Sequence, residues 1–269
     1  MLKFGDNNSD VTLLQHRLTH LGYTVTINGN FDADTLTAVH QLQRDKGLVI
    51  DGLVGNKTIS ALLKRDIRHL LSQQDINNAA ALLDVDAASI MALKSVESRG
   101  NGFLNDGRVV ILYERHVMRK RLRANGYTVA HVANLQNKYP NLVNAKTGGY
   151  RGYSAEHYRL QLAASIHNNS ALESCSWGLF QIMGYHWERL GYSSVTDFVG
   201  AMRANEGNQL HAFVQFIKTD KKLHNALTHG DWATVARLYN GPAYKKNNYD
   251  TRLQNAYAQF NNTEGAPWA

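Results

Sequence analysis

The sequence predicts a mainly α-helical protein, in which a small three-helix domain precedes a larger helical domain with a short β element. Three observations lead to this fold class. Apolar residues recur at helical spacing along most of the chain, only one segment has the composition of a strand, and the first 65 residues contain an internal repeat. The composition, 43% hydrophobic and 19% charged, excludes a disordered or fibrous protein. A chain of 269 residues corresponds to about two domains.

The first predicted helix precedes the repeat. Val11, Leu14, Leu18 and Leu21 fall on one helical face, and Gly22 is suited to end the helix.

Two copies of a turn followed by a helix start make up the repeat, one from Asn28 and the other from Asp51. The Asn-Gly and Asp-Gly dipeptides supply positive φ, and the threonine that follows can cap the next helix. Two copies are too few for a solenoid, which needs about three, so residues 1–65 are expected to form a compact unit of about three helices. The matched pairs, 23 residues apart, are Gly29 with Gly52, Thr35 with Thr58, and Ala38 with Ala61.

No Gly/Ser/Pro linker follows this unit, and residues 64–96 have a helical composition throughout. We therefore expect two domains, 1–65 and 75–269, joined by a short structured connection. The strand candidate is 109–113, which is rich in β-branched residues and follows a turn at Asp106-Gly107. The predicted helices of the larger domain are 86–97, 115–124, 128–137, 155–168, 195–203, 206–219, 232–239 and 249–260.

The net charge of +7 is uneven, with +1 in residues 1–65 and +6 in the remainder. Such an excess suits a polyanionic partner such as nucleic acid, an anionic envelope or an acidic polymer, or simply a soluble surface. The single cysteine, Cys175, excludes an intrachain disulfide and is expected to be a small buried side chain. The first residues contain no apolar signal segment, and no run of 18 apolar residues exists, so we expect cytosolic synthesis without membrane insertion.

A candidate general acid lies near the end of helix 86–97. Ile90, Leu93 and Glu97 share one helical face, so the carboxyl is expected to be partly desolvated. Desolvation raises the pKa of a carboxyl and suits it to donate a proton. The alternative is a glutamate at the rim that pairs with Lys94 or Arg99.

Residues 1–65 resemble the three-helix peptidoglycan-binding domain found on many cell-wall hydrolases. The segments that carry this resemblance include Leu21-Gly22-Tyr23, Asn28-Gly29 and Asp51-Gly52. Asn28 and Asp32 stand where that family usually has Asp and Gly.

The remainder resembles the lysozyme-like superfamily in the order of three segments: Glu97-Ser98, then 176–184, then 238–244. Further segments, among them 111–116 and 209–213, are similar to the N-acetylmuramidase family of modular phage endolysins over roughly residues 75–260. The resemblance implies that Glu97 is the acid. It also implies that substrate is contacted by Ser176, Gln181, Met183, Tyr239, Asn240 and Tyr244. Tyr239 could instead hydrogen-bond Glu97, and Trp177 and Tyr244 either support sugar rings or pack in the core.

Glycoside hydrolysis by this route also needs a second group that stabilises the transition state or activates water. The first candidate is Glu114, at the end of the predicted strand; the alternative for Glu114 is a buried pair with Arg115 or Arg119. The second candidate is Asp106, whose alternative is a turn-forming role. If neither carboxylate acts, the 6-hydroxyl of the sugar could attack, as in a lytic transglycosylase.

Other chemistries find no support, because no H-E-x-x-H, P-loop or G-x-G-x-x-G motif is present. We expect no metal and no cofactor. The basic segment 115–123 is either a solvated face or a contact for anionic outer-membrane components such as lipopolysaccharide, or for peptide-stem carboxylates.

The sequence thus predicts an endolysin that hydrolyses the β-1,4 bond between N-acetylmuramic acid and N-acetylglucosamine and so causes host lysis. The alternatives are a lytic transglycosylase and a non-catalytic wall-binding virion protein. The expected partner is bacterial peptidoglycan, without nucleic acid or stable membrane insertion, and the expected state is a monomer. The resemblance implies synthesis in the host cytoplasm and passage through a holin to the periplasm and cell wall.

Overall fold

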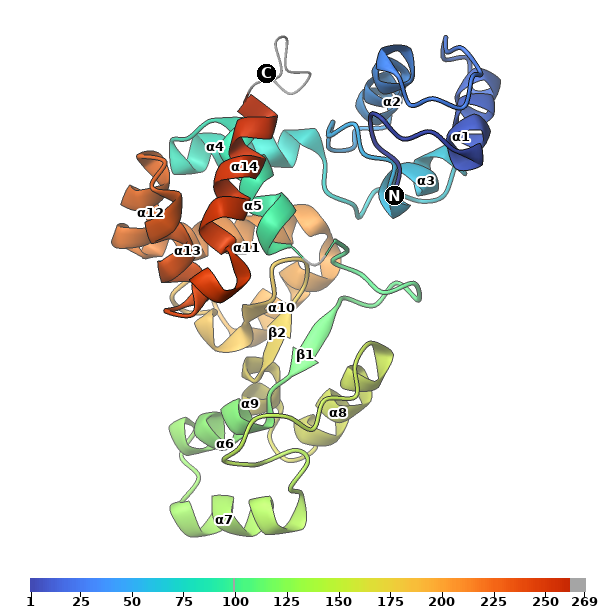
Figure 1. Cartoon of the computed structure of the whole chain (residues 1–269). Coiled ribbons are helices and arrows are strands. Elements are labelled where there is room, and N and C mark those ends of the chain that lie inside the picture. The colour runs from blue at the N-terminus through green and yellow to red at the C-terminus, as the bar shows by residue number, and fades with distance from the viewer. Residues whose placement is uncertain (99, 262–269) are drawn as a thin grey trace. The chain divides into compact units, whose positions relative to one another are not determined.

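The computed structural model describes residues 1–98 and 100–261, and this part of the chain is mainly helical (Figure 1). It divides into two compact units: residues 1–92 with the C-terminal segment from residue 255, and residues 93–254. The last eight positions of the expected larger domain, 262–269, lie outside the described residues.

The first unit begins with a three-helix module, as the sequence predicts. Its helices are α1 (Ser9–His20), α2 (Ala33–Asp45) and α3 (Asn56–Leu62). The predicted apolar face of α1 is buried, and Phe31 and the apolar face of α2 complete the core.

Each copy of the repeat is closed by a buried glutamine from the preceding helix. Gln15 Nε2 donates to Asn28 Oδ1 at 3.0 Å and to Thr35 Oγ1 at 2.9 Å, and Gln15 Oε1 accepts from the Gly29 amide at 2.9 Å. In the second copy Gln43 makes the same set of bonds, to Asp51 Oδ1, Thr58 Oγ1 and the Gly52 amide. The threonine that occurs in both copies is therefore part of a buried polar cluster. The hydrogen bonds of this cluster offset the cost of burying the glutamine side-chain amide.

The expectation of continuous helix over residues 64–96 is wrong. Lys64 has a φ of +55° just after α3, and helix resumes only at α4 (Gln73–Leu83), which Ser72 and Asp75 start with a capping box. α5 (Ala87–Glu97) follows, and the Asp86 carboxylate caps it by accepting from the Ser89 amide at 2.7 Å.

In the second unit, α6 to α9 lie at one end and α11 to α13 at the other, with β1, β2 and α10 between them (Figure 1). The strands β1 (Ile111–Tyr113), β2 (Cys175–Trp177) and β3 (Ile182–Met183) form an antiparallel sheet in that order. The helices are α6 (Arg115–Ala124), α7 (Val129–Lys138), α8 (Ser154–Ala164), α9 (Asn168–Glu173), α10 (Val195–Ala204), α11 (Glu206–Thr219), α12 (Lys221–Thr228), α13 (Trp232–Asn240) and α14 (Tyr249–Asn261, whose last turns belong to the first unit).

One predicted helix differs from the structure. The helix expected over 155–168 ends at Ala164, because His167 is extended and its ring accepts from the Ser170 amide to start α9. The short strands β2 and β3 and the helices α9 and α12 were not predicted. β2 and β3 have three and two residues, which is too short for an alternating pattern to reveal a strand.

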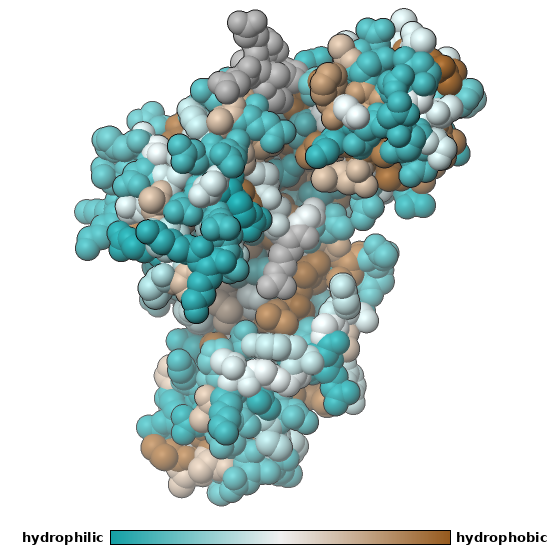
Figure 2. Space-filling view, in the orientation of Figure 1, coloured by the Kyte–Doolittle hydropathy of each residue, from teal (hydrophilic) through white to brown (hydrophobic). Residues whose placement is uncertain are grey.

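The surface of the second unit is uneven in hydropathy. Figure 2 shows a mainly hydrophilic face over α12 and α13, whereas hydrophobic side chains gather near β1. Within the described residues, no helix is long and apolar enough to cross a membrane.

The basic segment at α6 is largely used inside the protein. Arg115 donates to the carbonyls of Lys146 and Thr147, and Arg121 pairs with Glu173 at 2.8 Å. These guanidinium groups hold loops and helices together, whereas Lys120 and Arg123 of the same segment are exposed.

Candidate active site

Glu97 is the last residue of α5 and is half-buried. Asn240, at the end of α13, donates from Nδ2 to Glu97 Oε1 at 2.9 Å. Burial raises the pKa of Glu97, while the Asn240 hydrogen bond and the positive charge of Arg252 oppose that rise. Arg252 is thus a cation that acts on this carboxyl; Arg99, one of the two expected partners, lies outside the described residues.

Tyr239 joins this carboxyl to the rest of the site. Its ring packs edge-on against Phe213 at 5.3 Å, and its hydroxyl donates to the Phe180 carbonyl at 3.3 Å. Burial raises the pKa of Tyr239, and the negative charge of Glu97 raises it further. Glu97 thus lies near Tyr239, but the hydrogen bond that holds Glu97 comes from Asn240.

The hairpin of β2 and β3 carries the next three predicted residues. Ser176 Oγ donates to Gln181 Oε1 at 2.8 Å, and Gln181 Nε2 donates to the Gly178 carbonyl at 2.8 Å. Gln181 has a φ of +53°, an uncommon conformation outside glycine, which turns its side chain back over the hairpin. Met183 stands opposite Ser176 in the sheet and is half-buried.

A buried glutamine on α11 supports this hairpin. Gln209 Oε1 accepts from the Leu179 amide at 2.7 Å, and its Nε2 donates to the Met202 carbonyl at 2.8 Å. Gly102 and Gly178 lie against it, since a Cβ on either glycine would come within 2.1 and 2.5 Å of the Gln209 side chain. The sequence placed Gln209 in a family segment without a role; the structure gives it one.

The loop after α5 has a second buried support. Glu206 is fully buried, and its Oε1 accepts from the Gly102 amide at 2.8 Å. The Gly102 carbonyl accepts from Val110, which in turn accepts from the Gly178 amide. The end of α5, the start of β1 and the hairpin are therefore fixed to one another through backbone and buried side chains.

Glu114 follows β1 and begins α6, and its amide donates to the Ser174 carbonyl beside β2. The Tyr150 hydroxyl donates to both carboxylate oxygens, at 2.9 and 2.8 Å. His116 Nδ1 lies 3.1 Å from Glu114 Oε2. Within the described residues no ion pair joins Glu114 to Arg115 or Arg119; their Nε atoms donate to the Lys146 carbonyl and to Gln136 Oε1.

Tyr150 was not predicted from the sequence. It lies in a segment with three glycines at positive φ, Gly148, Gly149 and Gly152, and its side chain is 45% exposed. This Gly-Gly-Tyr-Arg-Gly pattern is the signal that could have found it, because such a loop needs a reason for its unusual backbone.

Two other candidates have structural roles. Asp106 is exposed and pairs with Arg108 at 2.6 Å, and hydrogen bonds from Arg108 lower the pKa of Asp106. Trp177 is fully buried, and its Nε1 donates to the Leu172 carbonyl at 3.1 Å, so it cannot offer a face to a sugar. Tyr244 begins the short 3-10 helix Tyr244–Asn247 and is partly exposed.

The contacts form one continuous path. Glu97 leads through Asn240 and Tyr239 to the hairpin, whose β2 pairs with β1, and β1 ends at Glu114. This arrangement places a carboxyl with a raised pKa at one end of the path and a carboxylate held by a tyrosine at the other. Among the described residues, no group of histidine, cysteine or carboxylate side chains is arranged to hold a metal ion.

Comparison with known proteins gives matches for both parts of the chain. The family model described as N-acetylmuramidase matches residues 86–261, and that described as putative peptidoglycan binding domain matches residues 7–62. The crystal structure of the Burkholderia AP3 phage endolysin is 46% identical in sequence, with a TM-score of 0.89, and the match covers 96% of this chain and 98% of that one. No curated protein gave a significant match.

Proposed function

The chain belongs to the N-acetylmuramidase family, and from that premise we propose how its residues carry out the reaction. It is a peptidoglycan-hydrolysing endolysin, a glycoside hydrolase that acts on the β-1,4 bond between N-acetylmuramic acid and N-acetylglucosamine.

In this proposal Glu97 is the general acid that protonates the bridging oxygen. The observation that carries the assignment is a half-buried carboxyl at a helix end, with its pKa raised by burial and one oxygen held by Asn240. A raised pKa favours the protonated form that a general acid needs, and the bond from Asn240 restrains the orientation of the carboxyl group.

Glu114 is the group that activates water in the same proposal. Its support is the Tyr150 hydroxyl, which holds both carboxylate oxygens, together with His116 beside it. Asp106 is the weaker candidate for this role, because Arg108 engages its carboxylate at an exposed turn.

The substrate contacts are assigned to the side chains along the path from Glu97 to Glu114. Gln181 and Ser176 present an amide and a hydroxyl that can exchange their mutual bond for bonds to N-acetyl or hydroxyl groups of a sugar. Asn240, Tyr239 and Met183 adjoin them, and the partly exposed ring of Tyr244 suits contact with a sugar face.

A lytic transglycosylase remains the second candidate. It is favoured by one observation: both oxygens of Glu114 already accept from Tyr150, which leaves less of the carboxylate for a water molecule. The mass of the products distinguishes the two reactions.

Residues 1–65 are proposed to hold the enzyme on its polymeric substrate, with the larger domain from about residue 75 carrying the reaction. The peptidoglycan-binding family match to residues 7–62 supports this division. Passage through a holin to the cell wall belongs to the same proposal and rests on the similarity to a phage endolysin.

The proposal is tested by Glu97→Gln, which keeps the shape of the side chain and the Asn240 contact but removes the acid. Loss of general acid catalysis costs about 10²-fold or more in rate. Release of soluble muropeptides from purified sacculi is the assay, and Glu188→Gln, an exposed glutamate of the same unit, is the matched control. A folded Glu97→Gln protein with the activity of the control contradicts the assignment.

A further inference from the structure

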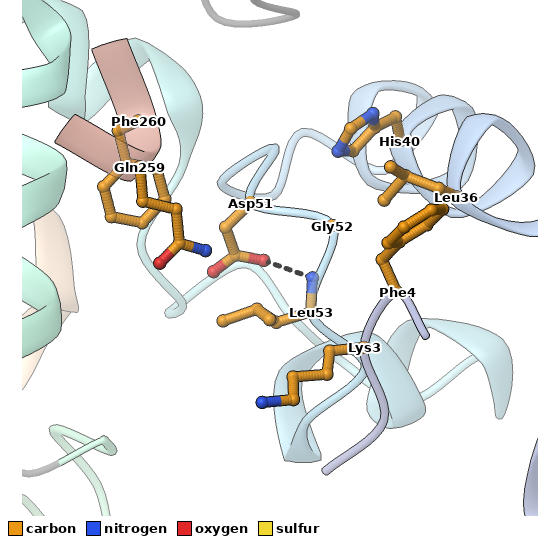
Figure 3. A pocket seen from close by; sticks show the side chains of 9 residues that line it. All are labelled: Lys3, Phe4, Leu36, His40, Asp51, Gly52, Leu53, Gln259 and Phe260. Atoms are coloured by element: carbon orange, nitrogen blue, oxygen red, sulfur yellow. Dashed lines mark hydrogen bonds between the residues drawn. The ribbon is translucent and has the colours of Figure 1, made fainter. Parts of the chain in front are cut away.

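The first unit contains a cavity of ≈ 410 Å³ beside the second turn of the repeat. Its size is that of a small-ligand pocket. Figure 3 shows side chains of the three-helix module on one side and the last turns of α14 on the other. The module contributes Lys3, Phe4, Leu36, His40, Asp51 and Leu53.

The two copies of the repeat differ at this cavity. Seven and three residues before Gln15, the chain has Asn8 and Thr12. The same offsets before Gln43 give Leu36 and His40. The Asn8 side chain is used to cap α1, whereas Leu36 and His40 face the cavity.

The glycine of the turn shows the same difference. A Cβ on Gly29 would lie 3.1 Å from Thr12 Oγ1, while a Cβ on Gly52 would lie 2.6 Å from Leu36 Cδ1 and 2.7 Å from His40 Nε2. Both copies keep the polar cluster that builds the turn, so the divergence is confined to the side chains that surround it.

The N-terminal segment completes the cavity with an aromatic ring and a cation. Phe4 is 60% exposed although it adjoins Leu36 and Leu53 at the cavity wall. Lys3 is exposed, and its ammonium makes no ion pair within residues 1–98 and 100–261. The cavity lining therefore combines apolar side chains with an exposed ammonium and with the Asp51 carboxylate, which accepts from Gln43 Nε2 and the Leu53 amide.

We propose that this cavity binds the peptide stem of peptidoglycan. The inference rests on the proposed function, since it assigns to one place in the module the wall binding that the module provides. In the glycan strand, each lactyl carboxyl group that forms an amide with a peptide stem has no charge. The stem itself carries free carboxylates and short aliphatic side chains. An ammonium beside an apolar wall matches a carboxylate next to an aliphatic side chain, and Asp51 matches an ammonium of the stem.

The test uses the full-length chain, retained on purified sacculi on ice, with two variants at the cavity and two matched controls. Phe4→Ala removes the exposed ring, and Leu13→Ala removes a leucine of the same module that is 59% exposed and outside the cavity. Lys3→Glu reverses the cation, and Lys46→Glu reverses an exposed lysine at the end of α2. The melting temperature of each variant confirms that the module stays folded.

Each cavity variant is expected to weaken retention by about tenfold, the effect of a side chain at the centre of a contact, while the controls bind as the unaltered chain does. A synthetic stem tetrapeptide with free carboxylates should compete for retention, and glycan strands stripped of their stems should not. Retention of Phe4→Ala and Lys3→Glu equal to their controls, or competition by stripped glycan alone, overturns the inference.

Hydrolysis of soluble, uncrosslinked glycan oligomers, measured in parallel, separates this inference from the proposed function. The cavity variants should hydrolyse these oligomers at the unaltered rate. If they do so and still bind sacculi fully, the cavity assignment fails alone; if the unaltered chain neither binds sacculi nor hydrolyses the oligomers, both proposals fail.

Discussion

Replacement of Gln209 by leucine tests how the site is supported. The change keeps the side-chain volume but leaves the Leu179 amide and the Met202 carbonyl without their partner. Gln209 is 1% exposed, so water cannot replace the lost bonds. The Met202 carbonyl lies in the last turn of α10, where the helix has no N–H group of its own to donate to it.

The magnitude follows from these two groups. Each buried polar group left unsatisfied costs about 1–3 kcal/mol, which gives a loss of about 2–6 kcal/mol in the free energy of unfolding. A domain of 150–250 residues loses about 2–4 °C of melting temperature per kcal/mol, so we expect a drop of about 5–20 °C. Gln209→Leu should also reduce activity at temperatures where it is folded, because the turn it anchors carries Gln181.

Calorimetry and urea unfolding measure the stability of this variant, and Gln215→Leu on the same helix is the matched control. Gln215 is half-buried, and the hydrogen bond of its side chain within the described residues is to the exposed His211 ring at 3.3 Å, so its replacement should change the melting temperature little. A melting temperature for Gln209→Leu within 1–2 °C of the control, about the effect of a surface substitution, would refute this reasoning.

Three further predictions concern the two carboxyl groups. Because burial raises the pKa of Glu97, the folded chain keeps a proton that the unfolded chain releases. The free energy of unfolding should therefore fall as the pH rises from the ordinary glutamate pKa through the raised value. Glu97→Gln should remove this decrease when melting temperature is measured against pH. Asn240→Leu removes a bond that lowers the pKa of Glu97, so the alkaline limb of the pH–activity profile should move to higher pH; an unmoved limb would contradict the acid role. Tyr150→Phe should lower kcat by about tenfold, the effect of losing one hydrogen bond to a charged group. Its melting temperature should stay near that of the unaltered chain, because Tyr150 is 45% exposed. Unchanged kcat in both Tyr150→Phe and Glu114→Gln would exclude Glu114 from the reaction.

Local sequence signals predicted the module and the end of α5 well. The apolar spacing of Val11, Leu14 and Leu18 requires one buried face, and the two Gly turns with their threonines require two similar corners. Asp86 predicted the start of α5, which placed Glu97 in its last turn.

Long-range contacts were less accessible. The bond between Asn240 and Glu97 joins residues 143 apart, and only the resemblance to a known family suggested that they share a site. For Trp177 the resemblance left two roles open, support of a sugar ring or packing in the core. The side chain is fully buried, so it packs in the core. The glycines of segment 148–152 mark an unusual loop, but they do not indicate that Tyr150 contacts Glu114, 36 positions away in the sequence.

The most direct test of the account is the mass of the products released from sacculi. Hydrolysis adds water and leaves a reducible N-acetylmuramic acid end, whereas transglycosylation leaves a 1,6-anhydro ring that is lighter by about 18 Da. The account predicts reducible ends from the unaltered chain and slower formation of the same ends by Glu114→Gln. Predominantly 1,6-anhydro products, with Glu114→Gln fully active, would contradict the hydrolytic mechanism.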